Sequence, residues 1–199
     1  EKVDSQIKDV VINNANDPLI YISGGGLGSH KINQKIFDDI KTLLPKYRII
    51  LQTGDNQNYK DFDKAIEIKN NLPVELKLKF LPIKFINDNN IGYVYNKSNF
   101  FIGRAGANTV YEIAVLTKPS IFIPIPWVTN NEQYENAKVL VDIGLSKIIE
   151  EDSLKSINLA NELEKNIHKL QKSDLHIEEL KKKFPTNAVE KILNDILKK

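Results

Sequence analysis

Short apolar runs alternate with longer amphipathic segments along most of the chain. The runs that predict strands cover residues 19–23, 47–53, 74–80, 100–102, 120–123 and 146–149. The segments that predict helices cover about residues 31–44, 61–70, 91–95, a stretch that starts at Thr109, and 132–143. Strands and helices that alternate through short loops predict an α/β fold, with a Rossmann-like parallel sheet covered by helices on both faces.

The two ends of the chain have different patterns. Residues 1–17 carry apolar positions at helical spacing and end in a cluster of turn formers, which predicts a helix or linker that enters a domain of residues 18–199. Residues 153–199 are predicted to form helices that break at Phe184-Pro185. Asn187 can cap the last of these helices, which is amphipathic over residues 187–197.

Composition narrows the class of protein. The chain has 199 residues, 41% of them hydrophobic, and no Cys, so it can form one large domain or two small ones without thiolate metal ligands or a Cys nucleophile. Its 28 basic and 26 acidic residues nearly balance, which argues against nucleic-acid binding.

No apolar stretch of membrane-spanning length and no secretory leader pattern occurs, so we expect a cytosolic protein. The absence of Met suggests a fragment of a longer protein or a trimmed chain.

The most glycine-rich segment lies between the first predicted strand and the helix that follows it. It contains Gly24, Gly25, Gly26, Leu27 and Gly28. Such a loop lets backbone N–H groups approach a diphosphate at the positive end of a helix dipole, and one or two glycines would suffice for a plain turn. The loop lacks the third glycine of a dinucleotide fingerprint and the Gly-Lys-Ser/Thr of a P-loop. It therefore favours a nucleoside diphosphate that is not part of a nicotinamide cofactor.

A second candidate segment follows the strand predicted at residues 100–102. Gly103, Arg104 and Gly106 precede a helix that starts near Thr109. Thr109 and Glu112 are three residues apart and match a capping box, which would explain both without a ligand. A carboxylate in the first turn at this edge of a parallel sheet is equally suited to hold the two hydroxyls of a ribose. Spacing alone leaves both roles open.

Taken together, these motifs resemble one family. The matching segments are Gly24 to Ser29 with Asn33, Gln52-Thr53-Gly54, Phe85-Ile86, Arg104 to Glu112, Lys118 to Pro124, and Gln133 to Ala137. They resemble the C-terminal half of MurG-type glycosyltransferases of the GT-B class, over about residues 19–151. This family transfers N-acetylglucosamine from UDP-GlcNAc to the lipid-linked muramyl-pentapeptide precursor of peptidoglycan.

The resemblance implies a role for individual residues. The glycine loop would face the donor diphosphate, Phe85 and Ile86 would lie beside uracil and read its edge largely through the backbone, and Glu112 would bind the ribose hydroxyls. Ala107, Asn108 and Thr109 would line the turn under the donor, and Gln133 would bind hydroxyls of the transferred sugar. Three positions depart from the family: Gly26 stands for its usual Ser, Leu27 for a Gln, and Glu132 for the first of two glutamines.

The resemblance also implies what the rest of the enzyme supplies. The mechanism is expected to be an inverting displacement, in which the N–H groups of Gly26 to Ser29 and the side chain of Arg104 stabilise the leaving UDP. The acceptor-binding domain and the catalytic base would lie outside this chain, so no catalytic residue, metal site or cofactor is expected here. His30, His168 and His176 lack evident acidic partners and are expected on the surface, with a minor alternative that His30 touches phosphate.

The expected partners are a UDP-sugar, an N-terminal acceptor domain or separate acceptor subunit, and a lipid-linked acceptor at the inner face of the cell membrane. Two other functions stay open: the donor-binding subunit of a split UDP-sugar transferase with a membrane-anchored partner, and a noncatalytic UDP-sugar-binding module.

The basic end, Lys181 to Lys183 with Lys198 and Lys199, is expected to be a solvated helical face, with attraction to anionic lipid as the alternative. Trp127 is expected either to pack on the sugar or to cover the core.

Overall fold

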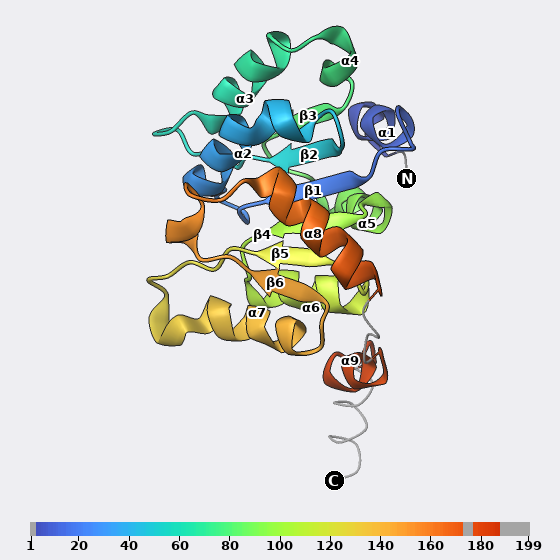
Figure 1. Ribbon diagram of the computed structural model, residues 1–199, viewed down its shortest axis with the longest axis vertical. Coiled ribbons are helices and arrows are strands. Elements are labelled where there is room, and N and C mark those ends of the chain that lie inside the picture. The colour runs from blue at the N-terminus through green and yellow to red at the C-terminus, as the bar shows by residue number, and fades with distance from the viewer. Residues whose placement is uncertain (1–2, 173–176, 188–199) are drawn as a thin grey trace.

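A six-stranded parallel sheet forms the centre of the protein (Figure 1). The computed structural model describes residues 3–172 and 177–187. The strand order is β3-β2-β1-β4-β5-β6, which is the order of doubly wound nucleotide-binding folds. The strands are β1 Leu19–Ser23, β2 Arg48–Gln52, β3 Phe80–Ile83, β4 Phe100–Gly103, β5 Ser120–Phe122 and β6 Ser146–Ile148. The predicted Rossmann-like α/β fold is therefore confirmed.

Helices cover both faces of the sheet because the strands present apolar side chains on both sides. Ile20 and Ile22 of β1 belong to one core cluster, whereas Leu19 and Tyr21 belong to the other. The first cluster is covered by α2 His30–Leu43, α3 Asp61–Asn70, α4 Val74–Lys77 and α8 Leu159–Lys172. The second is covered by α1 Ser5–Ile12, α5 Asp88–Lys97, α6 Ala107–Val115, α7 Glu132–Asp142 and α9 Ile177–Lys183. Two short 3-10 turns, η1 Thr129–Asn131 and η2 Glu151–Ser153, lie in loops after β5 and β6.

The first helix is packed into the domain. Ile7 and Val10 of α1 are buried in the second core cluster. Arg48, the first residue of β2, donates hydrogen bonds to the carbonyls of Val10 at 3.2 Å and Asp17 at 2.8 Å. The predicted N-terminal helix is thus tied to the sheet by apolar contacts and by a buried guanidinium.

One predicted strand is wrong. Residues 74–80 alternate apolar and charged positions, but Val74 to Lys77 form the helix α4, and the strand β3 runs from Phe80 to Ile83. Val74 is 72% exposed and Leu78 is 51% exposed, so the alternation does not mark a buried face. Pro82 is compatible with β3 because β3 lies at the edge of the sheet.

The remaining boundaries differ by smaller amounts. Helix α5 is longer than predicted because Asn87 caps it, accepting a hydrogen bond from the Asn90 N–H at 3.0 Å. Helix α9 ends at Lys183, before the predicted break at Phe184-Pro185. The predicted last helix, residues 187–197, lies outside the described residues beyond Asn187, as do Lys198 and Lys199.

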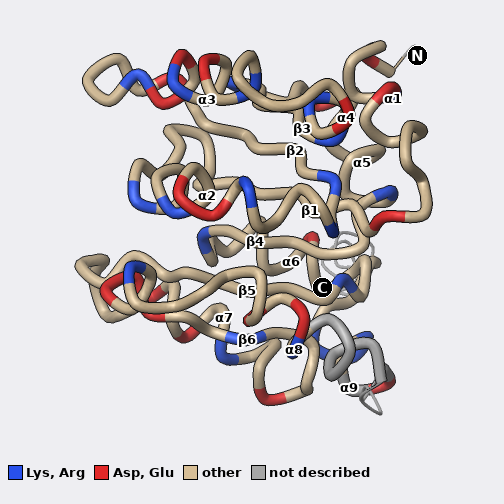
Figure 2. Tube along the Cα trace, turned by 45° about the horizontal axis from the view of Figure 1, so that its top comes forward, with Lys and Arg blue, Asp and Glu red and all other residues tan. Residues whose placement is uncertain are grey.

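Charged residues of both signs are interspersed on the outer helices, whereas the strands are almost free of charge (Figure 2). Helices α2, α3 and α7 each carry both signs. Among the helices of residues 3–172 and 177–187, none has the length and apolar character needed to cross a bilayer.

Candidate functional site

The candidate site lies where the order of the strands reverses. β1 and β4 are neighbours at the centre of the sheet, and their crossovers lead away in opposite directions. Ser23 at the end of β1 is in register with Gly103 at the end of β4. The loops that follow these two residues, 24–29 and 104–106, therefore begin side by side at the carboxyl edge, where ligands bind in open α/β sheets.

Two helices begin at this edge without a side-chain cap. The N-cap residue of α2 is Ser29 and that of α6 is Gly106, and neither makes a side-chain capping hydrogen bond. Neither helix has an acidic residue in its first turn. The first N–H groups of a helix lack intrahelical partners and carry partial positive charge. Two such ends at one crevice are suited to bind an anion such as a diphosphate.

Some glycines of these loops are required by the fold itself. A Cβ atom at Gly28 would lie 2.0 Å from the carbonyl oxygen of Thr53, and one at Gly54 would lie 2.4 Å from that of Leu27. Both glycines have positive φ, 77° and 73°. The loops after β1 and β2 therefore fit against each other at a distance that no other residue allows.

Other glycines face open space. A Cβ atom added at Gly25, Gly26 or Gly106 would meet nothing within 4 Å. Gly25 needs its positive φ of 88°, but Gly106 has an ordinary φ of −62°. The fold does not explain the small size of Gly26 and Gly106, whereas a ligand lying against the backbone would.

Of the two roles left open for Glu112, the structure does not support the capping box. Helix α6 starts at Ala107, so Thr109 is inside the first turn and is not the N-cap residue. The side chain of Glu112 is exposed, and the phenols of Tyr21 and Tyr95 lie near it. Burial, Tyr21 and Glu112 together raise the pKa of Tyr95, and burial is also the main cause that raises the pKa of Tyr21. Both phenols therefore stay protonated at neutral pH.

The loop between β3 and α5 carries the two residues predicted to lie beside a base. Phe85 is 50% exposed, and the backbone N–H of Ile86 donates to Oε1 of Gln52 at 3.1 Å. Gln52 also accepts from the Tyr21 hydroxyl at 3.2 Å. Gln52 thereby joins this loop to the ends of β1 and β2. Gln52 belongs to one of the motifs shared with the MurG-type family, but the sequence assigns it no role. Its hydrogen-bond partners Tyr21 and Ile86 lie 31 and 34 residues away.

The sequence predicts that Arg104 faces the leaving UDP. In the structure, the Arg104 guanidinium instead forms hydrogen bonds to other groups of the protein. One terminal nitrogen donates to the carbonyls of Ile123 at 2.9 Å and Pro124 at 3.2 Å. The other donates to Oγ of Ser29 at 2.7 Å and to Glu151. Arg104 therefore acts on the site through Ser29, by fixing the start of α2.

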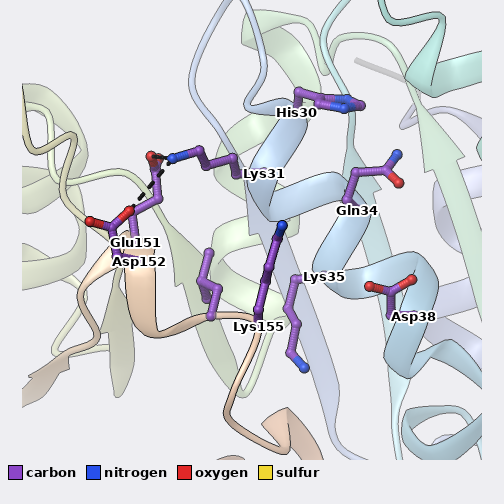
Figure 3. A pocket seen from close by; sticks show the side chains of 9 residues that line it. His30, Lys31, Gln34, Lys35, Asp38, Glu151, Asp152 and Lys155 are labelled. Atoms are coloured by element: carbon purple, nitrogen blue, oxygen red, sulfur yellow. Dashed lines mark ion pairs between the residues drawn. The ribbon is translucent and has the colours of Figure 1, made fainter.

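Glu151 was not singled out from the sequence, although it is central to this arrangement. Its carboxylate is buried and lies 2.6 Å from Nζ of Lys31, as Figure 3 shows. Burial acts to raise the pKa of Glu151, but hydrogen bonds from Lys31 and Arg104 outweigh it and hold the pKa below its ordinary value. A carboxylate after β6 thus links the start of α2 to the loop after β4.

The loop after β5 carries the residues predicted to contact the sugar. Glu132, the first residue of α7, is exposed, and Oε1 of Gln133 accepts from the N–H of Ile125 at 3.1 Å. Trp127 is 70% exposed, and Nζ of Lys31 lies 5.5 Å from the centre of its ring. Trp127 therefore does not cover the core.

The expectation that His30 has no acidic partner is wrong. Its Nδ1 lies 2.8 Å from Oδ1 of Asp61, and its ring stacks on Tyr59 with centroids 3.9 Å apart. Asn33 also donates to Asp61 at 2.8 Å. The side chain of His168 and the whole of His176 lie outside the described part of the structure.

A cavity of about 510 Å³ opens beside α2, on the face of the sheet opposite to Glu112 (Figure 3). It is lined by His30, Lys31, Gln34, Lys35, Asp38, Glu151, Asp152, Leu154 and Lys155. Within the described part of the chain, no group of three or more His, Cys, Asp or Glu side chains is placed to hold a metal ion.

The fold and the carboxyl-edge loops define a Rossmann-like nucleotide-binding domain. Residues 19–196 match the family described as Glycosyltransferase family 28 C-terminal domain, and the chain belongs to this family. The predicted MurG-type relationship is confirmed by the comparisons that follow.

Two curated relatives carry the same name, UDP-N-acetylglucosamine--N-acetylmuramyl-(pentapeptide) pyrophosphoryl-undecaprenol N-acetylglucosamine transferase. The one from Clostridium novyi is 30% identical over 91% of this chain and 46% of its own length. The one from Pediococcus pentosaceus is 34% identical over 91% of this chain and 48% of its own length. The crystal structure of Acinetobacter baumannii MurG superposes with a TM-score of 0.74 and 25% identity, over 94% of this chain and 54% of that one. The chain thus spans about half the length of the curated relatives that it matches.

Proposed function

We propose that this chain binds the nucleotide end of a UDP-sugar, with UDP-GlcNAc as the first candidate, and forms the donor-binding half of an inverting glycosyltransferase. The observation that carries the proposal is the presence of two uncapped helix N-termini at the carboxyl edge of β1 and β4, with the exposed carboxylate of Glu112 as the sixth residue of one of these helices, α6. These groups suit a ribosyl diphosphate, because one end of that ligand needs N–H donors and the other needs an acceptor for vicinal hydroxyls.

Each predicted site residue except Arg104, whose side chain is bonded within the protein, has a place in this proposal. Gly24 to Gly28 and the first N–H groups of α2 would face the diphosphate. Ala107, Asn108 and Thr109 would line the floor at the start of α6, and Glu112 would accept from the ribose. Phe85 and Ile86 would lie beside the base. Glu132 and Gln133 would contact the transferred sugar, Gln133 through its amide nitrogen because its oxygen already accepts from Ile125.

The proposed reaction is a direct displacement. An acceptor hydroxyl attacks the anomeric carbon of the sugar, and the bond from that carbon to the β-phosphate oxygen breaks, with its electron pair leaving on UDP. The N–H groups at the start of α2 would stabilise the negative charge that develops on the leaving diphosphate. The hydroxyl proton would pass to a base supplied outside this chain.

The proposed partners follow from the relatives. Both relatives are named for a muramyl-pentapeptide pyrophosphoryl-undecaprenol acceptor, which supports a lipid-linked acceptor and a peripheral position at the inner face of the cell membrane for the whole enzyme. An N-terminal acceptor domain or a separate acceptor subunit would form the second wall of the site. Because the relatives are named as transferases, their names favour the donor half of a transferase over a noncatalytic sugar-binding module.

The test is a titration of this chain with UDP, UDP-GlcNAc, UDP-glucose and GDP, for the wild type and for Glu112→Ala. We expect a preference for uridine nucleotides and a loss of about 1.5–3 kcal/mol of UDP binding in Glu112→Ala, the range for hydrogen bonds to charged groups. Glu75→Ala is the matched control, because Glu75 is an exposed carboxylate on α4, which precedes β3 and lies away from the carboxyl edge. Equal affinity for GDP and UDP, or full UDP binding by Glu112→Ala, would contradict the proposal.

A further inference from the structure

Trp127 is a large apolar side chain that the fold leaves in solvent. It is the single tryptophan of the chain, and 70% of it is exposed. It lies in the segment between β5 and α7, which leads on to Glu132 and Gln133. Single exposed apolar side chains are common on protein surfaces, so what distinguishes Trp127 is how it is held.

The backbone that leads to Trp127 is fixed by two other side chains. The guanidinium of Arg104, which is buried, donates to the carbonyl of Pro124 at 3.2 Å. Oε1 of Gln133 accepts from the N–H of Ile125 at 3.1 Å. These contacts hold the loop on the side of β4 and on the side of α7, so Trp127 projects from an anchored segment.

The indole ring of Trp127 is held in turn by Lys31, the second residue of α2. Nζ of Lys31 lies over the ring, 5.5 Å from its centre, which is the geometry of a cation–π contact. The same ammonium lies 2.6 Å from the buried carboxylate of Glu151, towards which Lys31 extends in Figure 3. One face of the ring therefore rests on an anchored cation, while most of the ring stays accessible.

This position suits the sugar of a nucleotide-sugar. The start of α2 is proposed to bind the diphosphate, and the sugar is bonded directly to the second phosphate. Lys31 places Trp127 beside this helix start, and the same loop continues to Glu132 and Gln133, which are proposed to contact sugar hydroxyls. The faces of a pyranose ring carry C–H groups, which pack well on the apolar, partially negative face of an aromatic ring.

We propose that Trp127 is a specificity-determining residue that stacks on the pyranose ring of the donor sugar, through the face of the indole that Lys31 leaves free. The inference rests on the proposed function, because it concerns the sugar of the same nucleotide-sugar. It assigns to Trp127 a contribution to binding of the sugar and none to binding of the nucleotide.

The experiment compares UDP with UDP-GlcNAc, which share the nucleotide and differ by the sugar. Binding is measured by isothermal titration for the wild type, Trp127→Ala and Trp127→Phe. Trp127→Ala removes the ring, so we expect the affinity for UDP-GlcNAc to fall about three- to tenfold, the range for a contact between two rings, while the affinity for UDP stays unchanged. Trp127→Phe keeps an aromatic face and should retain most of the affinity for UDP-GlcNAc.

Tyr93→Ala is the matched control. Nζ of Lys97 lies 5.9 Å from the centre of the Tyr93 ring, so this aromatic side chain also has a lysine over it. It belongs to α5, which carries none of the proposed sugar contacts. Its removal should leave the ratio of UDP-GlcNAc to UDP affinity unchanged.

The fluorescence of the wild type supplies a readout that does not depend on any variant. Because Trp127 is the single tryptophan, its emission reports on this ring alone. A sugar that stacks on the ring excludes water from it. UDP-GlcNAc should therefore move the emission maximum to shorter wavelength, and UDP should not.

The outcomes separate the two proposals. If the wild type binds neither UDP nor UDP-GlcNAc, the proposed function fails. If both bind, the role of Trp127 alone is overturned by an unchanged affinity ratio in Trp127→Ala, or by a ratio in Trp127→Phe as low as that in Trp127→Ala. An emission maximum that is the same with UDP-GlcNAc as with UDP would overturn it as well.

Discussion

At the scale of single residues, the glycines of the site fall into two groups that the sequence alone does not separate. Gly28, Gly54 and Gly103 are enclosed by backbone atoms, whereas Gly26 and Gly106 border open space. The first group is explained by packing between neighbouring loops and strands. The second group has no such explanation within the chain, which is why it supports a ligand that approaches the backbone.

This division predicts opposite effects for two substitutions three positions apart. Gly106→Ala should leave the thermal unfolding midpoint unchanged and weaken UDP binding, because its Cβ enters only the ligand space. Gly103→Ala should destabilise the fold by about 1–3 kcal/mol, because its Cβ would lie 2.1 Å from the carbonyl oxygen of Ser23. Calorimetric unfolding and UDP titration of both variants give the comparison. A lower unfolding midpoint in Gly106→Ala would show that an added Cβ atom disturbs the fold itself. The space beside Gly106 would then not be evidence for a ligand.

Residues with local signals were easier to predict than residues with distant partners. The glycine loop and Glu112 stand in short motifs, so their place at the carboxyl edge followed from the predicted strands. Gln52 and Glu151 bind partners that lie far away in the sequence, and several of these partners are backbone groups. A backbone N–H or carbonyl carries no residue-specific signal, so such contacts become visible only in three dimensions.

At the scale of elements, the central strands were predictable because they are buried on both faces. All five residues of β1 and of β2 are buried, and such strands are near-continuous apolar runs. The edge strand β3 was missed because the preceding residues imitate its alternation. Pro73 is the N-cap residue of α4, and Val74 and Leu78 are left exposed. The helix expected to start near Thr109 starts at Ala107, after the N-cap residue Gly106, which removes the alternative of a cap at Thr109.

Glu151 in η2 forms ion pairs with Lys31 of α2 and with Arg104 in the loop after β4, so removal of its charge should strongly destabilise the fold. In Glu151→Gln, the buried Arg104 guanidinium loses its counter-charge, so we expect a loss of about 3–5 kcal/mol of stability at pH 7. Asp152→Asn is the matched control, because that side chain is 88% exposed and 3.8 Å from Lys31. Its effect should stay within about 0.5 kcal/mol.

The ion pair between Glu151 and Arg104 also predicts that the free energy of unfolding depends on pH. The pKa of Glu151 is held below its ordinary value of 4.5, so its contribution to stability is full above that value and is lost as the pH falls through the folded pKa. Urea unfolding of the wild type and Glu151→Gln should therefore differ most near neutral pH, and the difference should shrink as the pH falls below 4.5 towards the folded pKa of Glu151. A gap that does not shrink at any pH at which the wild type still folds would exclude ionised Glu151 as its cause.

At the scale of the whole molecule, the carboxyl edge of the sheet carries exposed apolar side chains. Leu27, Phe85 and Trp127 lie on loops along it. The curated relatives are about twice as long as this chain. The fold and the family could be predicted from this sequence, whereas the donor site stays a prediction because no comparison tests its residues.

From this we predict that the chain binds donor without transferring sugar. With UDP-GlcNAc and a lipid-linked muramyl-pentapeptide acceptor, it should release no UDP above the rate of spontaneous hydrolysis, although isothermal titration detects donor binding. The full-length Clostridium novyi relative, assayed with the same acceptor, serves as the positive control. Turnover by this chain alone would mean that the general base lies within it.

The contact between the loops after β1 and β2 has a consequence for engineering. Gly28 and Gly54 are each blocked by main-chain atoms of the opposite loop, so a change at one cannot be rescued by a smaller side chain at the other. Exchanging either loop alone for one that lacks its glycine should therefore destabilise the fold. Grafting a new specificity onto this scaffold would require transplanting both loops as a single unit, and recombination that cuts between them should yield unstable chimaeras.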